Sequence, residues 1–169
     1  MASYLEDVKK LSELCRKCWG LCCNGGKEGS AISISYYELK KLKKPLEFKI
    51  GISKSPYGSM NKIVIQKDKP CPFIGGQKGK HLESGCILKG CTRPLGCRLF
   101  PLTFVIERNK LKFYLSGFCP YVKEAAKLES WINKTIKEAR GELKTWTKTE
   151  KLCRSYWHKS HGNLLEIPK

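Results

Sequence analysis

Four cysteines within nine residues restrict this chain more than any other feature of its sequence. They form a C-x2-C-x3-C-C pattern at Cys15, Cys18, Cys22 and Cys23. A C-x2-C step lets two sulfur atoms reach one metal from a single turn of backbone. Adjacent cysteines such as Cys22 and Cys23 bond each other only with strain. The pattern therefore predicts a chain that folds around a thiolate-bound metal rather than around disulfides.

The other cysteines extend this prediction to a centre made of sulfur ligands alone. Six more follow, at Cys71, Cys86, Cys91, Cys97, Cys119 and Cys153. The three histidines lie away from the N-terminal cluster, at His81, His158 and His161. Soft thiolates prefer zinc, iron–sulfur clusters and cuprous copper. Four thiolates complete one structural zinc site, whereas about eight serve two sites or a cluster with spare ligands. We therefore favour an iron–sulfur cluster, because about eight thiolates exceed what one closed zinc site needs, and zinc stays the alternative.

The remaining sequence predicts an α+β fold: a small, irregular cysteine-rich metal-binding domain with short strands and a C-terminal helical region. Hydrophobic periodicity and turn residues divide its first half. The expected elements are a helix over 3–14, a strand over 31–35, a helix over 35–44, a loop over 45–60 and a strand over 62–66. Ser35 and Glu38 have the spacing of a capping box, which starts the second helix, and Pro45 stops it.

The second half of the chain predicts a β-hairpin followed by helices. The hairpin strands are expected at about 102–107 and 111–116, joined by residues 108–110. Apolar spacing near 3.6 predicts a helix over 121–140, a second helical stretch to about residue 159, and a loose tail after Ser160. We therefore divide the chain into a cysteine-cluster metal-binding domain at 1–120 and a C-terminal helical extension at 121–169.

Charge and hydropathy limit the partners and the compartment. The net charge is +18, and 27 of the 33 basic residues are lysines. Lysine offers point charges rather than the bidentate phosphate contacts of arginine, so a solvated lysine surface is favoured over nucleic-acid binding. No stretch approaches the roughly 18 apolar residues of a membrane span. Residues 1–10 lack the apolar core of a signal peptide, and we expect a reducing cytoplasm.

The cysteine motifs also carry a family resemblance. After the N-terminal cluster come Cys71-Pro-Phe-Ile, Cys86-Ile and Arg93-Pro-x-x-Cys97-Arg98-x-Phe100-Pro101. In this order, residues 15 to about 120 resemble the YkgJ-type cysteine-cluster family of zinc- or iron-chelating proteins. The positions that match its ligands are Cys15, Cys18, Cys22, Cys23, Cys71, Cys86, Cys97 and Cys119. The gap between Cys86 and Arg93 is about one residue longer than in the family pattern, so Cys91 is an alternative ligand to Cys86.

The resemblance implies a metal-binding protein and leaves its activity open. A similar cysteine-cluster domain occurs in flagellin lysine methylases, where an iron–sulfur centre accompanies methyl transfer from S-adenosylmethionine. This chain has no glycine-rich nucleotide loop after a strand, so that cofactor would come by family analogy alone. Cys153 has no counterpart in the family, and we expect it to be a small buried hydrophobic residue.

Arg93 and Arg98 flank Cys97 in a chain with few arginines. Their guanidinium groups are candidates to donate hydrogen bonds to cluster sulfur or to hold an anionic substrate. The alternative is a structural ion pair with Asp68, Glu83 or Glu107. No catalytic residue is predicted, because the carboxylates show no paired spacing and a Ser-His-Asp arrangement lacks a suitable histidine.

Two functions follow from these observations. The favoured one is an iron–sulfur or zinc cysteine-cluster protein, acting as a redox or methyl-transfer component that modifies proteins and meets a protein or small-molecule partner. The alternative is a zinc-stabilised binding module that contacts nucleic acid or an acidic protein through its lysines. Whether the chain is an enzyme stays open.

Overall fold

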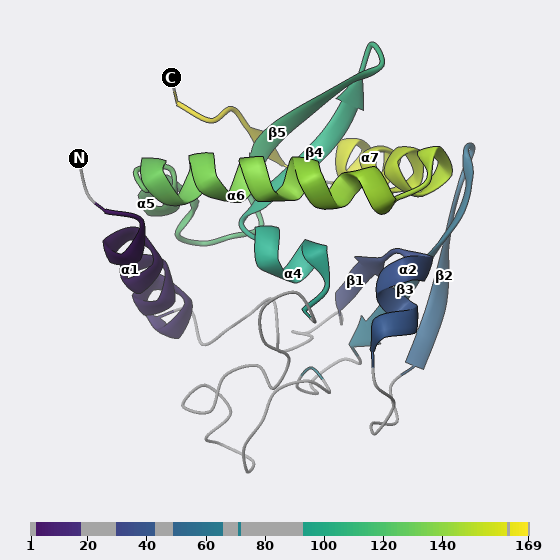
Figure 1. Cartoon of the computed structure of the whole chain (residues 1–169), viewed down its shortest axis with the longest axis horizontal. Coiled ribbons are helices and arrows are strands. Elements are labelled where there is room, and N and C mark those ends of the chain that lie inside the picture. Colours follow the sequence, from purple (N-terminus) through teal and green to yellow (C-terminus); the bar gives the residue numbers. More distant parts are fainter. Residues whose placement is uncertain are drawn as a thin grey trace.

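A computed structural model describes residues 3–17, 30–42, 49–65, 71, 93–161 and 163–168 of the 169-residue chain. It confirms the α+β class, because helices pack around two small antiparallel sheets (Figure 1). The N-terminal elements are α1 (Tyr4–Lys17), β1 (Ser30–Ile34), α2 (Tyr36–Lys41), β2 (Lys49–Ser55), β3 (Gly58–Ile65) and α4 (Leu95–Leu99). The others are β4 (Leu102–Glu107), β5 (Lys110–Ser116), α5 (Val122–Ala125), α6 (Glu129–Glu142), a 3-10 turn (Leu143–Thr145), α7 (Lys148–His161) and β6 (Leu164–Leu165).

The first sheet has the strand order β1-β3-β2, with both pairs antiparallel. The prediction of a loop over 45–60 is wrong for its described part, because β2 and the first residues of β3 lie there. The inward positions of β2 hold the small residues Gly51, Ser53 and Ser55, while Ile50 and Ile52 alternate on its exposed face. The short apolar alternation therefore does not mark a buried face, and the Gly, Ser and Pro residues around it favour a loop. Pairing with β3 supplies the strand instead.

The predicted hairpin forms the second sheet, whose order is β4-β5-β6. Its turn contains Arg108 and Asn109, which both have positive φ angles of 47° and 61°. Two such residues match the turn that best follows the twist of a two-strand hairpin. The prediction of a loose tail after Ser160 is wrong, because Leu164 pairs with Ser116 at the edge of this sheet. A two-residue strand is too short to leave a periodic signal.

The helices predicted at 3–14 and 35–44 are present as α1 and α2. α2 begins with the predicted capping box at Ser35 and Glu38 and ends at Lys41, before Pro45. The single helix predicted over 121–140 is two helices, α5 and α6, separated at the buried Leu128, whose backbone leaves helical geometry. The second C-terminal helix is α7. It starts with hydrogen bonds between Thr147 and Glu150 that form a second capping box.

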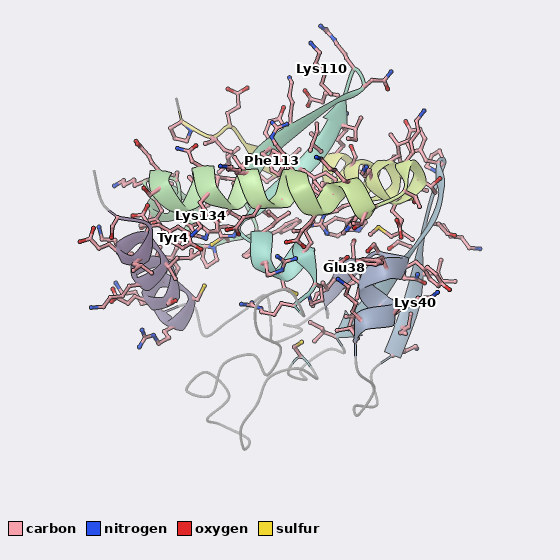
Figure 2. The ribbon with its side chains drawn as sticks, viewed as in Figure 1. Tyr4, Glu38, Lys40, Lys110, Phe113 and Lys134 are labelled. Carbon is pink, nitrogen blue, oxygen red and sulfur yellow. The ribbon has the colours of Figure 1, made fainter. Side chains whose placement is uncertain are left out.

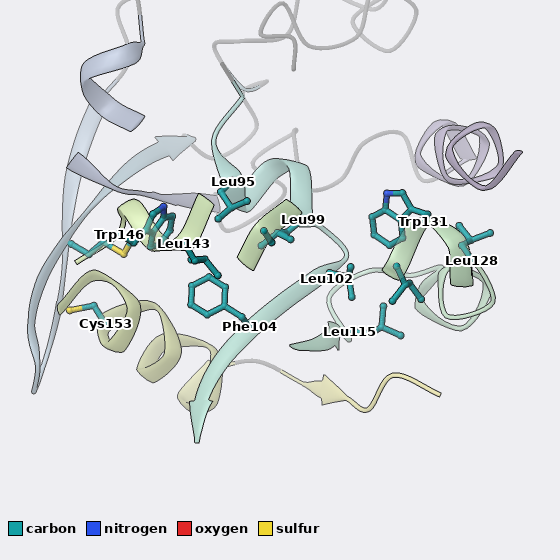
Figure 3. Close-up of a cluster of buried hydrophobic side chains, with 13 residues drawn as sticks. Leu95, Leu99, Leu102, Phe104, Leu115, Leu128, Trp131, Leu143, Trp146 and Cys153 are labelled. Carbon is teal, nitrogen blue, oxygen red and sulfur yellow. The ribbon is translucent and has the colours of Figure 1, made fainter. Parts of the chain in front are cut away.

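One hydrophobic cluster joins the hairpin to the C-terminal helices. Figure 3 shows its buried side chains, including Leu95, Leu99, Leu102, Phe104, Leu115, Leu128, Trp131, Leu143, Trp146 and Cys153. α7 contacts β4, β3 and β2, so it packs against both sheets. The hydrophobic core thus combines side chains from both of the predicted parts of the chain, 1–120 and 121–169. Cys153 is buried in this cluster, as predicted, and its sulfur accepts a hydrogen bond from the Ser55 hydroxyl (3.0 Å).

Helix length and hydropathy give one further result. Within the described residues, no helix is both long enough and apolar enough to cross a membrane.

His158 of α7 predicts a loss of stability in mild acid. Its side chain is buried, and burial with nearby Arg154 lowers its pKa from 6.5 to about 3. Below pH 6.5 the unfolded chain binds a proton at this histidine that the folded chain does not, so stability falls as the pH falls. From pH 7 to pH 5 the free energy of unfolding should drop by about 2 kcal/mol from this group.

Denaturant unfolding of the wild type and of His158→Gln at pH 5, 6 and 7 measures this loss. The variant lacks the histidine that titrates. Its free energy of unfolding should therefore fall by about 2 kcal/mol less than that of the wild type between pH 7 and pH 5. Identical pH slopes for the two proteins would contradict the assignment.

Candidate metal centre

The described residues include half of the eight predicted ligands. These are Cys15, Cys71, Cys97 and Cys119. The other predicted ligands, Cys18, Cys22, Cys23 and Cys86, and the alternative Cys91 lie outside the described residues. Among the described side chains, no group of three His, Cys, Asp or Glu residues is arranged to hold a metal ion.

Cys97 lies in α4, a five-residue helix that three separate contacts hold in place. Leu95 and Leu99 are 2% and 0% exposed and anchor one face of the helix in the core (Figure 3). The Leu95 N–H donates to Oε1 of Glu38 in α2 (2.6 Å). The Arg98 guanidinium binds the carboxylate of Glu142 in α6 through both terminal nitrogens. A helix this short is stabilised by its tertiary contacts rather than by propensity, so they fix the position of Cys97.

Arg98 forms a structural ion pair, which was one of the two roles predicted for it. Its partner is Glu142 rather than one of the three predicted carboxylates. Glu142 is 44 residues away in the sequence. Of the candidates proposed for this pair, Asp68 and Glu83 lie outside the described residues. Glu107 instead contacts Lys112 (2.7 Å) and accepts a hydrogen bond from the Tyr114 hydroxyl, and these contacts lower its pKa.

Arg93 bears on the other predicted role, in which an arginine donates a hydrogen bond to cluster sulfur or holds an anionic substrate. It lies just before α4, and its carbonyl oxygen accepts a hydrogen bond from Nε of Arg98 (3.0 Å). Its own Nε is buried and has no hydrogen-bond partner among the described residues. Buried polar atoms normally have a partner. The side chain therefore has a donor available for a group outside the described part of the chain.

The other three described cysteines lie at the ends of different elements. Cys15 is exposed near the end of α1, which packs against α6. Two contacts fix that packing: the buried Asp7 carboxylate accepts the Trp131 N–H (3.2 Å), and the Lys134 ammonium lies 3.8 Å from the Tyr4 ring centre (Figure 2). Cys71 is buried with Ile34, Leu42, Ile63 and Ile65, and Cys119 is half-buried in the turn before α5.

The arrangement of the elements is compatible with a shared centre. Figure 1 shows that α1 ends, β3 ends and α4 begins toward the same side of the molecule. Cys15 lies near the first of these ends, Cys71 follows β3 by a few residues, and Cys97 lies in α4. The polypeptide therefore leads three predicted ligands toward one side from three separate elements.

Arg154 is a site residue that the sequence did not predict. It lies in α7, is only 6% exposed, and its guanidinium carbon is 5.3 Å from the centre of the Phe104 ring. Burial lowers its pKa to about 10, while Glu38 and Cys97 act in the opposite direction, so the side chain stays charged at neutral pH. Its Nε has no hydrogen-bond partner among the described residues.

The chemistry of these residues fits a thiolate-bound metal. Four thiolates on one zinc ion, or on an iron–sulfur cluster, give a centre with net negative charge, which nearby cations and hydrogen-bond donors stabilise. Two guanidinium groups, each with a buried Nε that lacks a hydrogen-bond partner among the described residues, lie just before α4 and against it. Cys97 thus lies in an electropositive setting, but the four described cysteines are not grouped around one ion.

Comparison with protein-family models, with curated proteins and with solved structures gives no match for this chain. The resemblance to the YkgJ-type cysteine-cluster family therefore rests on the cysteine motifs, and it stays a prediction.

Glu38 offers a test of how α4 is held. Glu38→Ala removes one acceptor of the α2 capping box and the acceptor of the Leu95 N–H. Loss of a helix cap and of one charge-assisted hydrogen bond predicts a decrease of about 3 kcal/mol in the free energy of unfolding. Denaturant unfolding measures it, with Glu13→Ala on the exposed face of α1 as control, expected to change stability by less than about 0.5 kcal/mol. Equal effects of the two substitutions would show that α4 does not depend on Glu38.

Proposed function

We propose that this chain is a cysteine-cluster metal-binding protein that holds an iron–sulfur cluster, with zinc as the alternative metal. The observation that carries the proposal is the C-x2-C-x3-C-C cluster with four further thiols in ordered motifs. The placement of Cys97 supports it. A metal ligand works best on an element whose position is fixed by packing and hydrogen bonds, and α4 has both.

Iron is favoured because of the number of thiols. Eight predicted ligands, two of them adjacent, exceed the four that one closed zinc site needs. A [4Fe–4S] cluster also takes four cysteines, so the others would hold a second metal or serve a redox step. When bound, an iron–sulfur cluster supplies one-electron redox chemistry. The chain itself supplies the thiolates, and Arg93, just before α4, supplies a buried hydrogen-bond donor.

The wider activity follows by analogy with the resembling family. That analogy gives a redox or methyl-transfer component that modifies a protein substrate. In the methyl-transfer case, S-adenosylmethionine would be the methyl donor. Metal and acid-labile sulfide content, with an absorption spectrum, on protein purified without air tests the first step. Iron with sulfide and a broad visible absorption supports the proposal, whereas colourless protein with stoichiometric zinc supports a structural metal.

Ligand substitutions separate metal-binding cysteines from the core cysteine. Cys22→Ser and Cys97→Ser should lower the bound metal sharply, because a serine hydroxyl is a poor ligand for these soft metals. Cys153→Ser is the matched control, since Cys153 packs in the hydrophobic core and contacts Ser55. Metal content per folded protein, measured by elemental analysis, should stay near the wild-type value in the control. Equal metal content in all three variants would refute the ligand assignment.

A binding module that contacts nucleic acid is the second candidate function, and α2 provides its specific observation. Tyr36 and Tyr37 are 59% and 47% exposed, and the ammonium groups of Lys40 and Lys41 lie 4.5 Å and 4.2 Å from their ring centres. Aromatic rings among lysines are suited to stacking single-stranded bases. Figure 2 shows Lys40 and Lys110 in distant parts of the molecule, so these two lysines do not belong to one basic patch. The metal-centred function stays the first proposal because the cysteine motifs carry it.

The second function makes a distinct prediction. Tyr36→Ala would weaken binding of a labelled single-stranded oligonucleotide by about fivefold or more, through loss of base stacking. Lys123→Gln on α5, far along the chain from α2, is the control. Fluorescence anisotropy at several salt concentrations measures the affinities, which should fall steeply with salt. Weak binding that Tyr36→Ala leaves unchanged would reject this function and leave the lysines as a solvated surface.

A further inference from the structure

Arg154 is a buried cation that has no ion pair among the described residues. Its exposed fraction is only 6%. Moving a cation out of water is strongly unfavourable unless a nearby anion and hydrogen bonds replace its hydration. The Phe104 ring gives a partial replacement through its electron-rich face. A single ring does not supply hydrogen-bond acceptors for a guanidinium.

Two carboxylates on the neighbouring helices, Glu38 of α2 and Glu150 of α7, each accept hydrogen bonds from backbone N–H groups. Glu38 accepts the Leu95 N–H at one oxygen (2.6 Å) and the Ser35 N–H at the other (2.9 Å). Glu150 likewise accepts the Tyr36 N–H (2.7 Å) and the Thr147 N–H (2.8 Å). Both groups sit at helix N-termini, where their charge stabilises the helix dipole. The charge of Arg154 therefore needs a further negative group.

The guanidinium reaches α4 because residue 96 is a glycine. A Cβ atom added at Gly96 would lie 3.0 Å from Nη1 of Arg154 and 3.4 Å from Nη2. The cation thus lies directly on the backbone of the residue before Cys97. Burial lowers the pKa of Arg154, and Glu38 and then Cys97 act against that change. The guanidinium of Arg154, whose Nε has no hydrogen-bond partner among the described residues, lies against the residue that precedes the predicted ligand Cys97.

We propose that Arg154 is a positioning residue of the metal centre, placed by the open backbone of Gly96 to offset the negative charge of the metal-bound Cys97 sulfur. This inference rests on the proposed metal-binding function and extends it to a residue outside every cysteine motif. A guanidinium suits the role because it is planar, permanently charged and weakly hydrated. It would strengthen metal binding and, for an iron–sulfur cluster, raise the reduction potential, because a nearby cation favours the more negative reduced state.

The test compares four full-length proteins: wild type, Arg154→Met, Arg154→Lys and Arg140→Met. Arg140 is the matched control, because it is an exposed arginine whose guanidinium lies 5.4 Å from the Phe113 ring centre. Competition with a chelator measures metal affinity, and a redox titration measures the potential if the metal is iron. Arg154→Met should lower metal affinity by about 10- to 100-fold, the effect typical of residues that support metal ligands. Arg154→Met should also lower the reduction potential. Arg154→Lys should retain most of the wild-type metal affinity and reduction potential, and Arg140→Met should retain both in full.

Gly96→Ala provides an independent variant, in case Arg154→Met does not fold. It keeps the arginine but places a methyl group against the guanidinium, so it should reduce metal affinity in the same direction. Circular dichroism and thermal unfolding confirm that each variant is folded. The inference alone would be overturned if folded Arg154→Met had wild-type metal affinity and reduction potential. If Arg154→Met does not fold, the same result for folded Gly96→Ala would overturn it. A wild-type protein that binds no metal would overturn the proposed function as well, so the two failures are distinguishable.

Discussion

The carboxylates of Glu150 and Glu38 connect three helix N-termini, and the position of α4 depends on them. Glu150 completes the capping box of α7 and also accepts the Tyr36 N–H at the start of α2. Glu38 completes the capping box of α2 and also accepts the Leu95 N–H at the start of α4. Each carboxylate thus uses one oxygen for its own helix and the other for the next. Because helix N-terminal N–H groups need acceptors, this sequence of bonds relates the placement of Cys97 to α7.

Local parts of this arrangement were predictable, and long-range parts were not. Ser35 and Glu38 are three residues apart, so the capping box follows from spacing alone. The second partner of Glu38 is 57 residues away, and that of Glu150 is 114 residues away. No local pattern encodes which distant N–H a carboxylate oxygen meets. For the same reason, β2 and β6 escaped prediction: pairing with β3 and β5 creates them, while their own side chains give little periodic signal.

The candidate site divides in a similar way. Thiol chemistry and short spacings identify the cysteines, since metal ligands come in characteristic motifs. The surroundings of Cys97 come from elements far along the chain. Arg98 pairs with Glu142 of α6, and Arg154 approaches from α7. In the sequence, Arg154 is one basic residue in a basic helix. Only burial against Phe104 and Gly96 distinguishes it from the lysines around it.

The use of arginine argues that the charge around α4 is specific. The chain contains 27 lysines and six arginines, so a basic residue placed only for surface charge would usually be lysine. Three of the six arginines, Arg93, Arg98 and Arg154, nevertheless lie beside or within a helix of five residues. Two of them use a property that lysine lacks: Arg98 makes a two-pronged contact with Glu142, and Arg154 is a planar cation that tolerates burial. A general basic composition does not explain this concentration. Glu142 accounts for Arg98, and the proposed anionic centre at Cys97 would account for Arg93 and Arg154.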